Sequence, residues 1–134
     1  RKNYCFWPVQ AKWSSLHRDL DGYIPCFKAD GDHWSFVRLD EHGTAVEVVE
    51  KKRISDNATI GLYWFRSVEA FKSVYEKRYG QGVSAQTEAY IAPLYNDMIV
   101  DGLKVGISHV PPERVHVLGT PAEVQVFADS SMGF

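Results

Sequence analysis

The sequence alternates between runs with the spacing of β-strands and runs with the spacing of α-helices, and this alternation limits the folds open to it. Residues 34–39 and 44–51 are rich in strand-forming side chains and flank Asp40-Glu41-His42-Gly43, which predicts a hairpin with a four-residue loop. Residues 58–65 are apolar and aromatic, which predicts a strand buried on both of its faces. The first half of the chain is therefore expected to form most of a sheet.

Helix signals follow these strands. Ser67 can cap a helix whose apolar residues recur at helical spacing up to Gly80, a residue suited to the left-handed position after a helix end. Pro93 fits only near the start of a second helix, which Gly102 ends. Residues 120–123 form a capping box with proline at the first helical position, which predicts a short third helix.

Three further strands complete the expected sheet. Residues 23–28 form a short apolar run, and Pro25 within it predicts an edge strand or an interrupted one. Residues 103–107 alternate as a strand, and residues 114–118 are predicted to form another. Because the hairpin is antiparallel while the later strands are separated by helices, the sequence predicts an α/β domain, layered, with a mixed sheet.

Length and charge limit the partners. A chain of 134 residues fits one compact domain, expected over residues 21–134, after an irregular segment of residues 1–20 that follows neither period. The net charge is -2, with basic and acidic residues mixed along the chain, which argues against nucleic acid or an anionic membrane as a partner. The longest basic run, Lys51-Lys52-Arg53, can neutralise one phosphate group, so a small phosphorylated ligand is the better partner.

The sequence also favours a cytoplasmic protein that does not cross a membrane. The two cysteines, Cys5 and Cys26, are not needed as a disulfide in a chain with a full set of core residues. No apolar stretch approaches the ~20 residues needed to cross a bilayer, and the N-terminus lacks the apolar block of a secretion signal. The histidines stand at no recognised metal-ligand spacing, so no metal site is expected.

Four segments carry motifs in a distinctive order: residues 48–51 (VVEK), 58–65 (ATIGLYWF), 87–96 (TEAYIAPLYN) and 117–121 (VLGTP). In this order and separation they resemble the second, C-terminal half of the sugar-1-phosphate nucleotidyltransferases. The resemblance covers about residues 21–129 and implies a fold like the second half of a nucleotide-diphospho-sugar transferase. It also implies that the half that holds the nucleotide is missing at the N-terminus.

The resemblance implies four substrate-binding residues. The pair Glu50-Lys51 ends a strand, and Lys51 would contact the phosphate of the sugar phosphate. Gly61 would let the sugar approach the backbone, and Glu88 would accept hydrogen bonds from sugar hydroxyls. Each residue type suits its role: an ammonium for a phosphate, a residue without Cβ for close approach, and a carboxylate for hydroxyls.

Each of these residues also has a purely structural interpretation. Lys51 can be a solvated charge at a strand end, and Gly61 can mark a bulge or tight packing against a helix. Glu88 can be a carboxylate favoured by the dipole at a helix start. Both interpretations of each residue remain open at this point.

The chain also departs from the family pattern. It has no glycine-rich loop for a nucleotide triphosphate and no aspartate at the position of a second metal ligand, where Val117 stands. Magnesium is therefore expected only together with the missing half, with no cofactor in this chain and no catalysis by it alone.

Two functions follow. The first is a partial nucleotidyltransferase-like domain that binds a sugar phosphate or related phosphorylated alcohol. The alternative is a non-catalytic binding or self-associating protein derived from such an enzyme. Loss of half of the fold would expose a sheet edge, so a homo-oligomer is expected, with Phe6, Trp7 or Trp13 at or near the contact.

Overall fold

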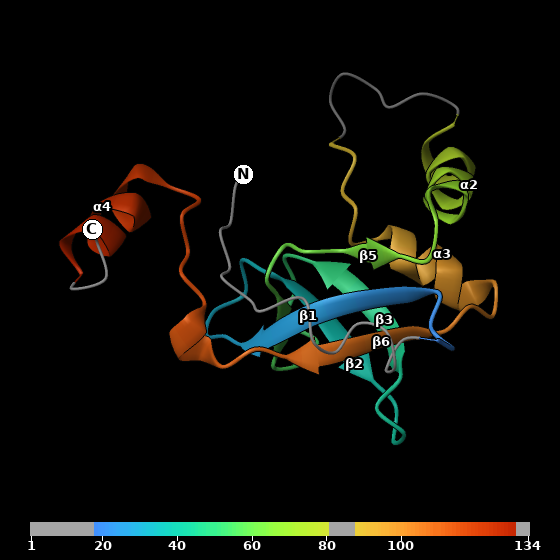
Figure 1. The fold of residues 1–134 in the computed structure, drawn as a ribbon, viewed down its shortest axis with the longest axis horizontal. Helices are drawn as coiled ribbons and strands as arrows, with labels where there is room; N and C mark the ends of the chain where they lie inside the picture. Colours follow the sequence, from blue (N-terminus) through green and yellow to red (C-terminus); the bar gives the residue numbers. More distant parts are fainter. Residues whose placement is uncertain (1–17, 81–87, 131–134) are drawn as a thin grey trace.

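The computed structural model of the chain describes residues 18–80 and 88–130. These residues form a mixed sheet of six strands, with α3 against the sheet and α2 against α3 (Figure 1). This confirms the predicted α/β class with a mixed sheet and an antiparallel hairpin. The strands are β1 (Gly22–Lys28), β2 (Ser35–Leu39), β3 (Ala45–Glu50), β4 (Asn57–Thr59), β5 (Trp64–Phe65) and β6 (Val105–His109), and the helices are α2 (Val68–Tyr79), α3 (Leu94–Val100) and α4 (Pro121–Asp129).

Strand β1 is central and continuous, so the prediction of an edge strand or an interrupted one there is wrong. It pairs with β6 in parallel along one edge and with β4 and β5 in antiparallel along the other. The Pro25 carbonyl accepts from the Ile60 N–H on the β4 side, so the nitrogen of Pro25, which has no hydrogen, faces that side too. On that side, Pro25 lies between the residues of β1 that pair with β4 and those that pair with β5. A proline fits a central strand because it lies opposite this gap.

The predicted hairpin is confirmed. Strands β2 and β3 pair in antiparallel, with a register shift between Arg38 and Leu39. The Asp40 carboxylate accepts from the backbone N–H groups of His42 and Thr44, each at 2.9 Å, and these bonds hold the pKa of Asp40 below its usual value. Gly43 has φ 79°, a left-handed conformation that favours glycine. The turn is therefore specified locally.

Of two further predicted strands, one is interrupted and one is wrong. Residues 58–65 form two short strands, because Gly61 adopts φ 82° and turns the chain away from β1 between them. Residues 114–118 pair with none of the described strands. Pro112–Arg114 form a 3₁₀ turn, closed by the Val115 N–H on the Pro112 carbonyl at 3.0 Å, because consecutive prolines remove two backbone donors and favour a turn.

The predicted helices are confirmed, with one local difference. The Ser67 hydroxyl accepts from the Ala70 N–H at 3.0 Å, and Thr120 and Glu123 form both bonds of the capping box at the start of α4. Gly80 is not left-handed: its φ is -63°, and its N–H continues the helical pattern to the Glu76 carbonyl.

Helix α3 is fastened to the sheet by three polar contacts. The Asn96 carboxamide spans the backbone of buried Val48 in β3: its Oδ1 accepts from the Val48 N–H at 2.7 Å and its Nδ2 donates to the Val48 carbonyl at 2.5 Å. Tyr95 is fully buried, stacks on Phe65 at 4.8 Å and donates its hydroxyl to the Trp64 carbonyl at 2.9 Å. The orientation of α3 is therefore fixed against both β3 and β5.

The described residues contain no helix long and apolar enough to span a membrane. Cys26 is buried in the core, and burial raises the pKa of its thiol to about 12. Phe6, Trp7 and Trp13 lie outside the described residues, as do residues 1–17 of the predicted irregular segment.

Replacing Asn96 by alanine should destabilise the fold by about 2 kcal/mol or more, because it leaves two backbone groups of Val48 without partners. Urea denaturation followed by far-UV circular dichroism measures the loss. Gln125→Ala is the matched control, since among the described residues the Gln125 amide bonds only to Asp129, on the surface of α4. A loss for Asn96→Ala no larger than for the control would contradict the role of this contact.

Candidate functional site

A cleft of about 550 Å³ opens at the end of β3. Its walls come from β2, the end of β3, the β4–β5 turn, the segment before α3 and the segment that leads into α4. All four predicted site residues, Glu50, Lys51, Gly61 and Glu88, line it. The other lining residues are His33, Trp34, Ser35, Thr59, Tyr63, Tyr90, Val117, Gly119, Thr120 and Glu123.

Lys51 occupies an unusual backbone position. Its φ is 54°, and it is the one described residue other than glycine with a positive φ. Its N–H donates to the Trp34 carbonyl at 2.8 Å, which holds the end of β3 to the strand beside it. A residue with a Cβ is disfavoured in this conformation, and such conformations gather at functional sites. The turn directs the exposed Lys51 side chain to the cleft.

The Lys51 ammonium belongs to a chain of three polar groups. Its Nζ lies 3.2 Å from the Tyr90 hydroxyl and 5.3 Å from the centre of the Tyr90 ring. The Tyr90 hydroxyl donates in turn to the Glu88 carboxylate. The hydrogen bond with Tyr90 raises the pKa of Lys51, and the nearby charges of Glu50 and Glu88 add to the rise. The ammonium therefore remains charged throughout the neutral range.

The floor of the cleft is a second polar group, built from the sheet. The Ser35 hydroxyl donates to the Glu50 carboxylate, and the Tyr63 and Thr59 hydroxyls lie 3.0 Å apart. Burial raises the pKa of Tyr63, and hydrogen bonds with Thr59 and Ser35 oppose the rise. Tyr63 thus keeps its proton, and its hydroxyl can donate a hydrogen bond to a ligand oxygen.

Gly61 lies between these groups, in the turn that separates β4 from β5. Its φ of 82° favours glycine, so the turn alone accounts for this residue, as the structural interpretation given above requires. Its position in the wall of the cleft is compatible with the functional one as well. The two interpretations are not exclusive here, because the turn that needs glycine also exposes its backbone.

The far wall comes from the segment that enters α4. Val117, Gly119, Thr120 and Glu123 line the cleft, so Val117 lies in the same cleft as the four predicted site residues. The valine cannot ligate a metal ion, and the described residues contain no group of three potential metal-binding side chains. Glu123 already accepts from the Thr120 N–H at 2.7 Å in the capping box.

Several site residues are absent from the sequence prediction. Ser35 and Tyr90 meet Glu50 and Lys51 across 15 and 39 residues, whereas Thr59 and Tyr63 stand two residues on either side of Gly61. Tyr90 gave the best signal, since it stands two residues after Glu88 in a segment that carries the resemblance. Of the two tryptophans near these strands, Trp34 lines the cleft and Trp64 does not.

Comparison with known proteins assigns the fold to a class. The sequence matches no protein-family model and no curated protein. The structure is similar to that of a nucleoside-diphosphate-sugar pyrophosphorylase from Vibrio cholerae RC9, at 33% identity and a TM-score of 0.74. The similarity covers 83% of this chain and 47% of the pyrophosphorylase, so the chain spans about half the length of that protein. The fold is thus nucleotidyltransferase-like.

Removing the Tyr90 hydroxyl should lower the pKa of Lys51 toward its ordinary value of 10.5, because that hydrogen bond is the largest cause of the rise. Since the pKa is raised in the folded chain, its contribution to stability is present below pH 10.5 and is lost as the pH rises through the folded value. The ε-carbon shift of Lys51, followed by NMR from about pH 8 to 12 in Tyr90→Phe, measures the pKa. The matched control is Tyr75→Phe, an exposed tyrosine outside the cleft, and an equal pKa in both variants would contradict the contact.

Proposed function

We propose that the cleft binds a sugar phosphate, or a related phosphorylated alcohol, as the sugar-phosphate half of a nucleotidyltransferase-like protein. The observation that supports this most is the convergence of one ammonium, Lys51, with the carboxylates of Glu50 and Glu88 in one cleft. A phosphate monoester with several hydroxyls offers the matching groups.

Lys51 is the proposed phosphate ligand. An ammonium has three donors, and the Tyr90 hydroxyl takes one, which leaves two for phosphate oxygens. Charge-assisted hydrogen bonds of this kind are short and roughly twice as strong as neutral ones. The left-handed backbone at Lys51 fixes where the side chain leaves the sheet, so the charge is directed before a ligand arrives.

The carboxylates are the proposed partners of the hydroxyls. Glu88 accepts a hydrogen bond from the Tyr90 hydroxyl and Glu50 accepts one from the Ser35 hydroxyl, yet each carboxylate has further lone pairs to accept from a ligand. Tyr63 adds a protonated phenol to the same floor. Trp34 lines the cleft and offers an apolar face to the carbons of the ligand. A ligand with hydroxyls is thus favoured over a bare phosphate.

The transfer reaction needs more than this cleft. In nucleotidyl transfer, an oxygen of the sugar phosphate attacks the α-phosphorus of a nucleoside triphosphate, the new P–O bond forms, and pyrophosphate leaves. That chemistry rests on positioning of the triphosphate and on cations that neutralise its charge. We propose that those groups come from sequence outside this chain, and that this chain supplies the binding and orientation of the attacking phosphate.

Lys51→Met should weaken binding of glucose 1-phosphate about tenfold to a hundredfold, the range expected when one charged hydrogen-bonding group is lost. Lys52→Met is the matched control, since it removes the same charge from the next residue, which is exposed and outside the cleft. Isothermal titration calorimetry measures both. Equal losses in the two variants would show that general charge, not Lys51, attracts the ligand.

The chain alone should release no pyrophosphate from nucleoside triphosphates mixed with sugar 1-phosphates and magnesium. Loss of one preorganised donor costs a rate factor of about 10²–10³, so loss of a whole triphosphate site should abolish turnover. A coupled pyrophosphate assay measures the rate, with a no-protein sample as the control. Release above that control would contradict the assignment of the nucleotide site to other sequence.

A further inference from the structure

The cleft holds more negative charge than positive charge. Three carboxylates line it, those of Glu50, Glu88 and Glu123, and Lys51 is the one lysine or arginine among the lining residues. With histidine counted as neutral, three carboxylates against one ammonium leave an excess of two negative charges. A phosphate monoester adds a further charge of about -1.5 to -2 at neutral pH. A ligand that brought only a phosphate and neutral hydroxyls would therefore increase the imbalance.

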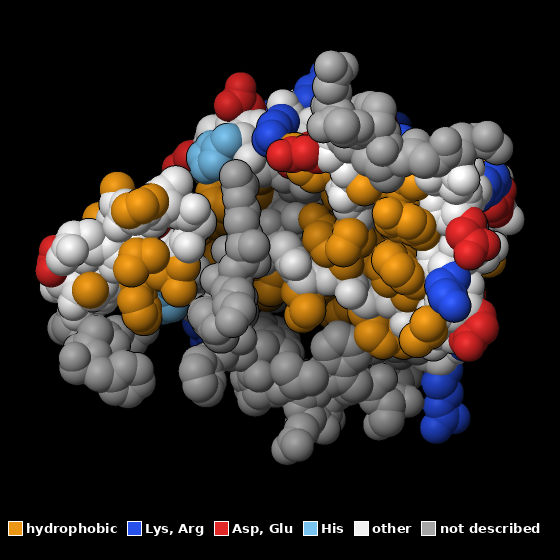
Figure 2. Space-filling model, turned by 90° about the horizontal axis from the view of Figure 1, so that it is seen from above, with side chains coloured by type: hydrophobic (Ala, Val, Ile, Leu, Met, Phe, Trp, Pro, Cys, Tyr) orange, Lys and Arg blue, Asp and Glu red, His pale blue; other side chains and the backbone are white. Residues whose placement is uncertain are grey.

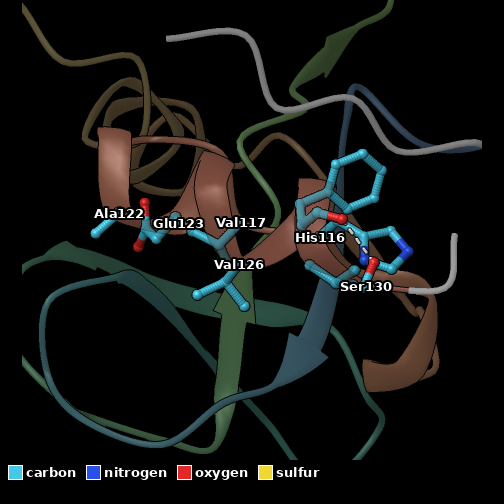
Figure 3. A pocket seen from close by; sticks show the side chains of 8 residues that line it. His116, Val117, Ala122, Glu123, Val126 and Ser130 are labelled. Carbon is cyan, nitrogen blue, oxygen red and sulfur yellow. Dashed lines mark hydrogen bonds between the residues drawn. The ribbon is translucent and has the colours of Figure 1, made fainter. Parts of the chain in front are cut away.

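The surroundings of the cleft do not offset this charge. On the face shown in Figure 2, acidic and basic side chains are interspersed and form no patch of one sign. Glu123 and Val117 line both the cleft and an apolar hollow of about 490 Å³, and Figure 3 shows no lysine or arginine among the side chains of that hollow. Within the described part of the chain, none of the three carboxylates forms an ion pair.

The three carboxylates are also not arranged to hold a metal ion together. The described residues contain no group of three potential metal-binding side chains. Glu50 is bound by a side chain of β2, Glu88 by the segment before α3, and Glu123 by the start of α4. Because the carboxylates are held by separate parts of the wall, we expect the positive charge to arrive on the ligand itself.

Glu50 is the carboxylate best placed to meet a cation of the ligand. It is half-buried at the end of β3, and the one hydrogen bond that it accepts comes from a neutral donor, the Ser35 hydroxyl. Its charge reaches the floor of the cleft, since it helps to raise the pKa of Tyr63. Glu88 is exposed, where an ion pair contributes little, and Glu123 already accepts a hydrogen bond in the capping box.

We propose that the ligand of the cleft is a zwitterion, a phosphorylated amino sugar or amino alcohol whose phosphate binds Lys51 and whose ammonium pairs with Glu50. This rests on the proposed function and narrows it, because an ammonium takes the place of one hydroxyl. The Lys51 ammonium is bound by Tyr90 and the Glu50 carboxylate by β2, so the two charges face the ligand without forming an ion pair with each other. Charge-assisted hydrogen bonds are roughly twice as strong as neutral ones, which favours an ammonium over a hydroxyl at Glu50.

Two pairs of ligands that differ in a single group test the zwitterion. An ammonium replaces one hydroxyl between glucose 1-phosphate and glucosamine 1-phosphate, and between 2-hydroxyethyl phosphate and ethanolamine phosphate. Isothermal titration calorimetry of the full chain, at neutral pH with EDTA to remove metal ions, measures all four dissociation constants. We expect a dissociation constant about fivefold to tenfold lower for the ammonium ligand of at least one pair. The pair that shows this preference distinguishes an amino sugar from an amino alcohol.

Glu50→Gln tests which carboxylate is responsible. The new amide oxygen can still accept from the Ser35 hydroxyl, so circular dichroism should show a retained fold, and the preference for the ammonium ligand should disappear. Glu47→Gln is the matched control. It removes the same charge from the same strand, at a residue outside the cleft that pairs with Arg38, and should keep the preference.

The outcomes separate this inference from the proposed function. If the phosphate ligands bind and Lys51→Met weakens them, the proposed function stands. In that case the zwitterion is still overturned by an absence of preference in both pairs, by a preference that survives Glu50→Gln, or by one that Glu47→Gln removes equally. No binding of any of the four ligands would contradict both the inference and the proposed function.

Discussion

Two hydrogen bonds between the Asn96 carboxamide and the Val48 backbone determine where the site forms. They join α3 to β3 across a separation of 48 residues in the chain. Lys51 follows β3 directly, and the segment that carries Glu88 and Tyr90 leads into α3. With α3 fixed on β3, the Tyr90 hydroxyl comes within 3.2 Å of the Lys51 ammonium. The polar chain in the cleft is thus a consequence of how the helix is attached to the sheet.

Much of the fold could be predicted because its signals are local. The Asp40–Gly43 turn, the Ser67 cap and the capping box at Thr120 each depend on side chains within four residues of one another. The failures are non-local. No residue near Pro25 indicates that two short partner strands, β4 and β5, leave a gap opposite its nitrogen. That gap exists because Gly61 interrupts the run of residues 58–65, which was predicted as one strand.

The candidate site also has residues that could be predicted from local motifs and residues that could not. Glu50, Lys51, Gly61 and Glu88 could be named in advance because the motifs around them resemble a known family, and the structure brings all four into one cleft. Their partners could not be named, because Tyr90 meets Lys51 across 39 residues and Ser35 meets Glu50 across 15. Such contacts arise from sheet register and helix docking, which cannot be inferred from a single sequence. The left-handed backbone of Lys51 could not be predicted from the sequence either.

The most direct test of the account is an NMR titration of the full chain with glucose 1-phosphate, in which backbone amide shifts are followed residue by residue. The account predicts that the largest shifts fall on Lys51, Gly61 and Glu88, and that an equal concentration of glucose or of inorganic phosphate produces smaller shifts. No shift at saturating ligand, or shifts confined to α2, which does not line the cleft, would contradict the assignment of this cleft to a sugar phosphate.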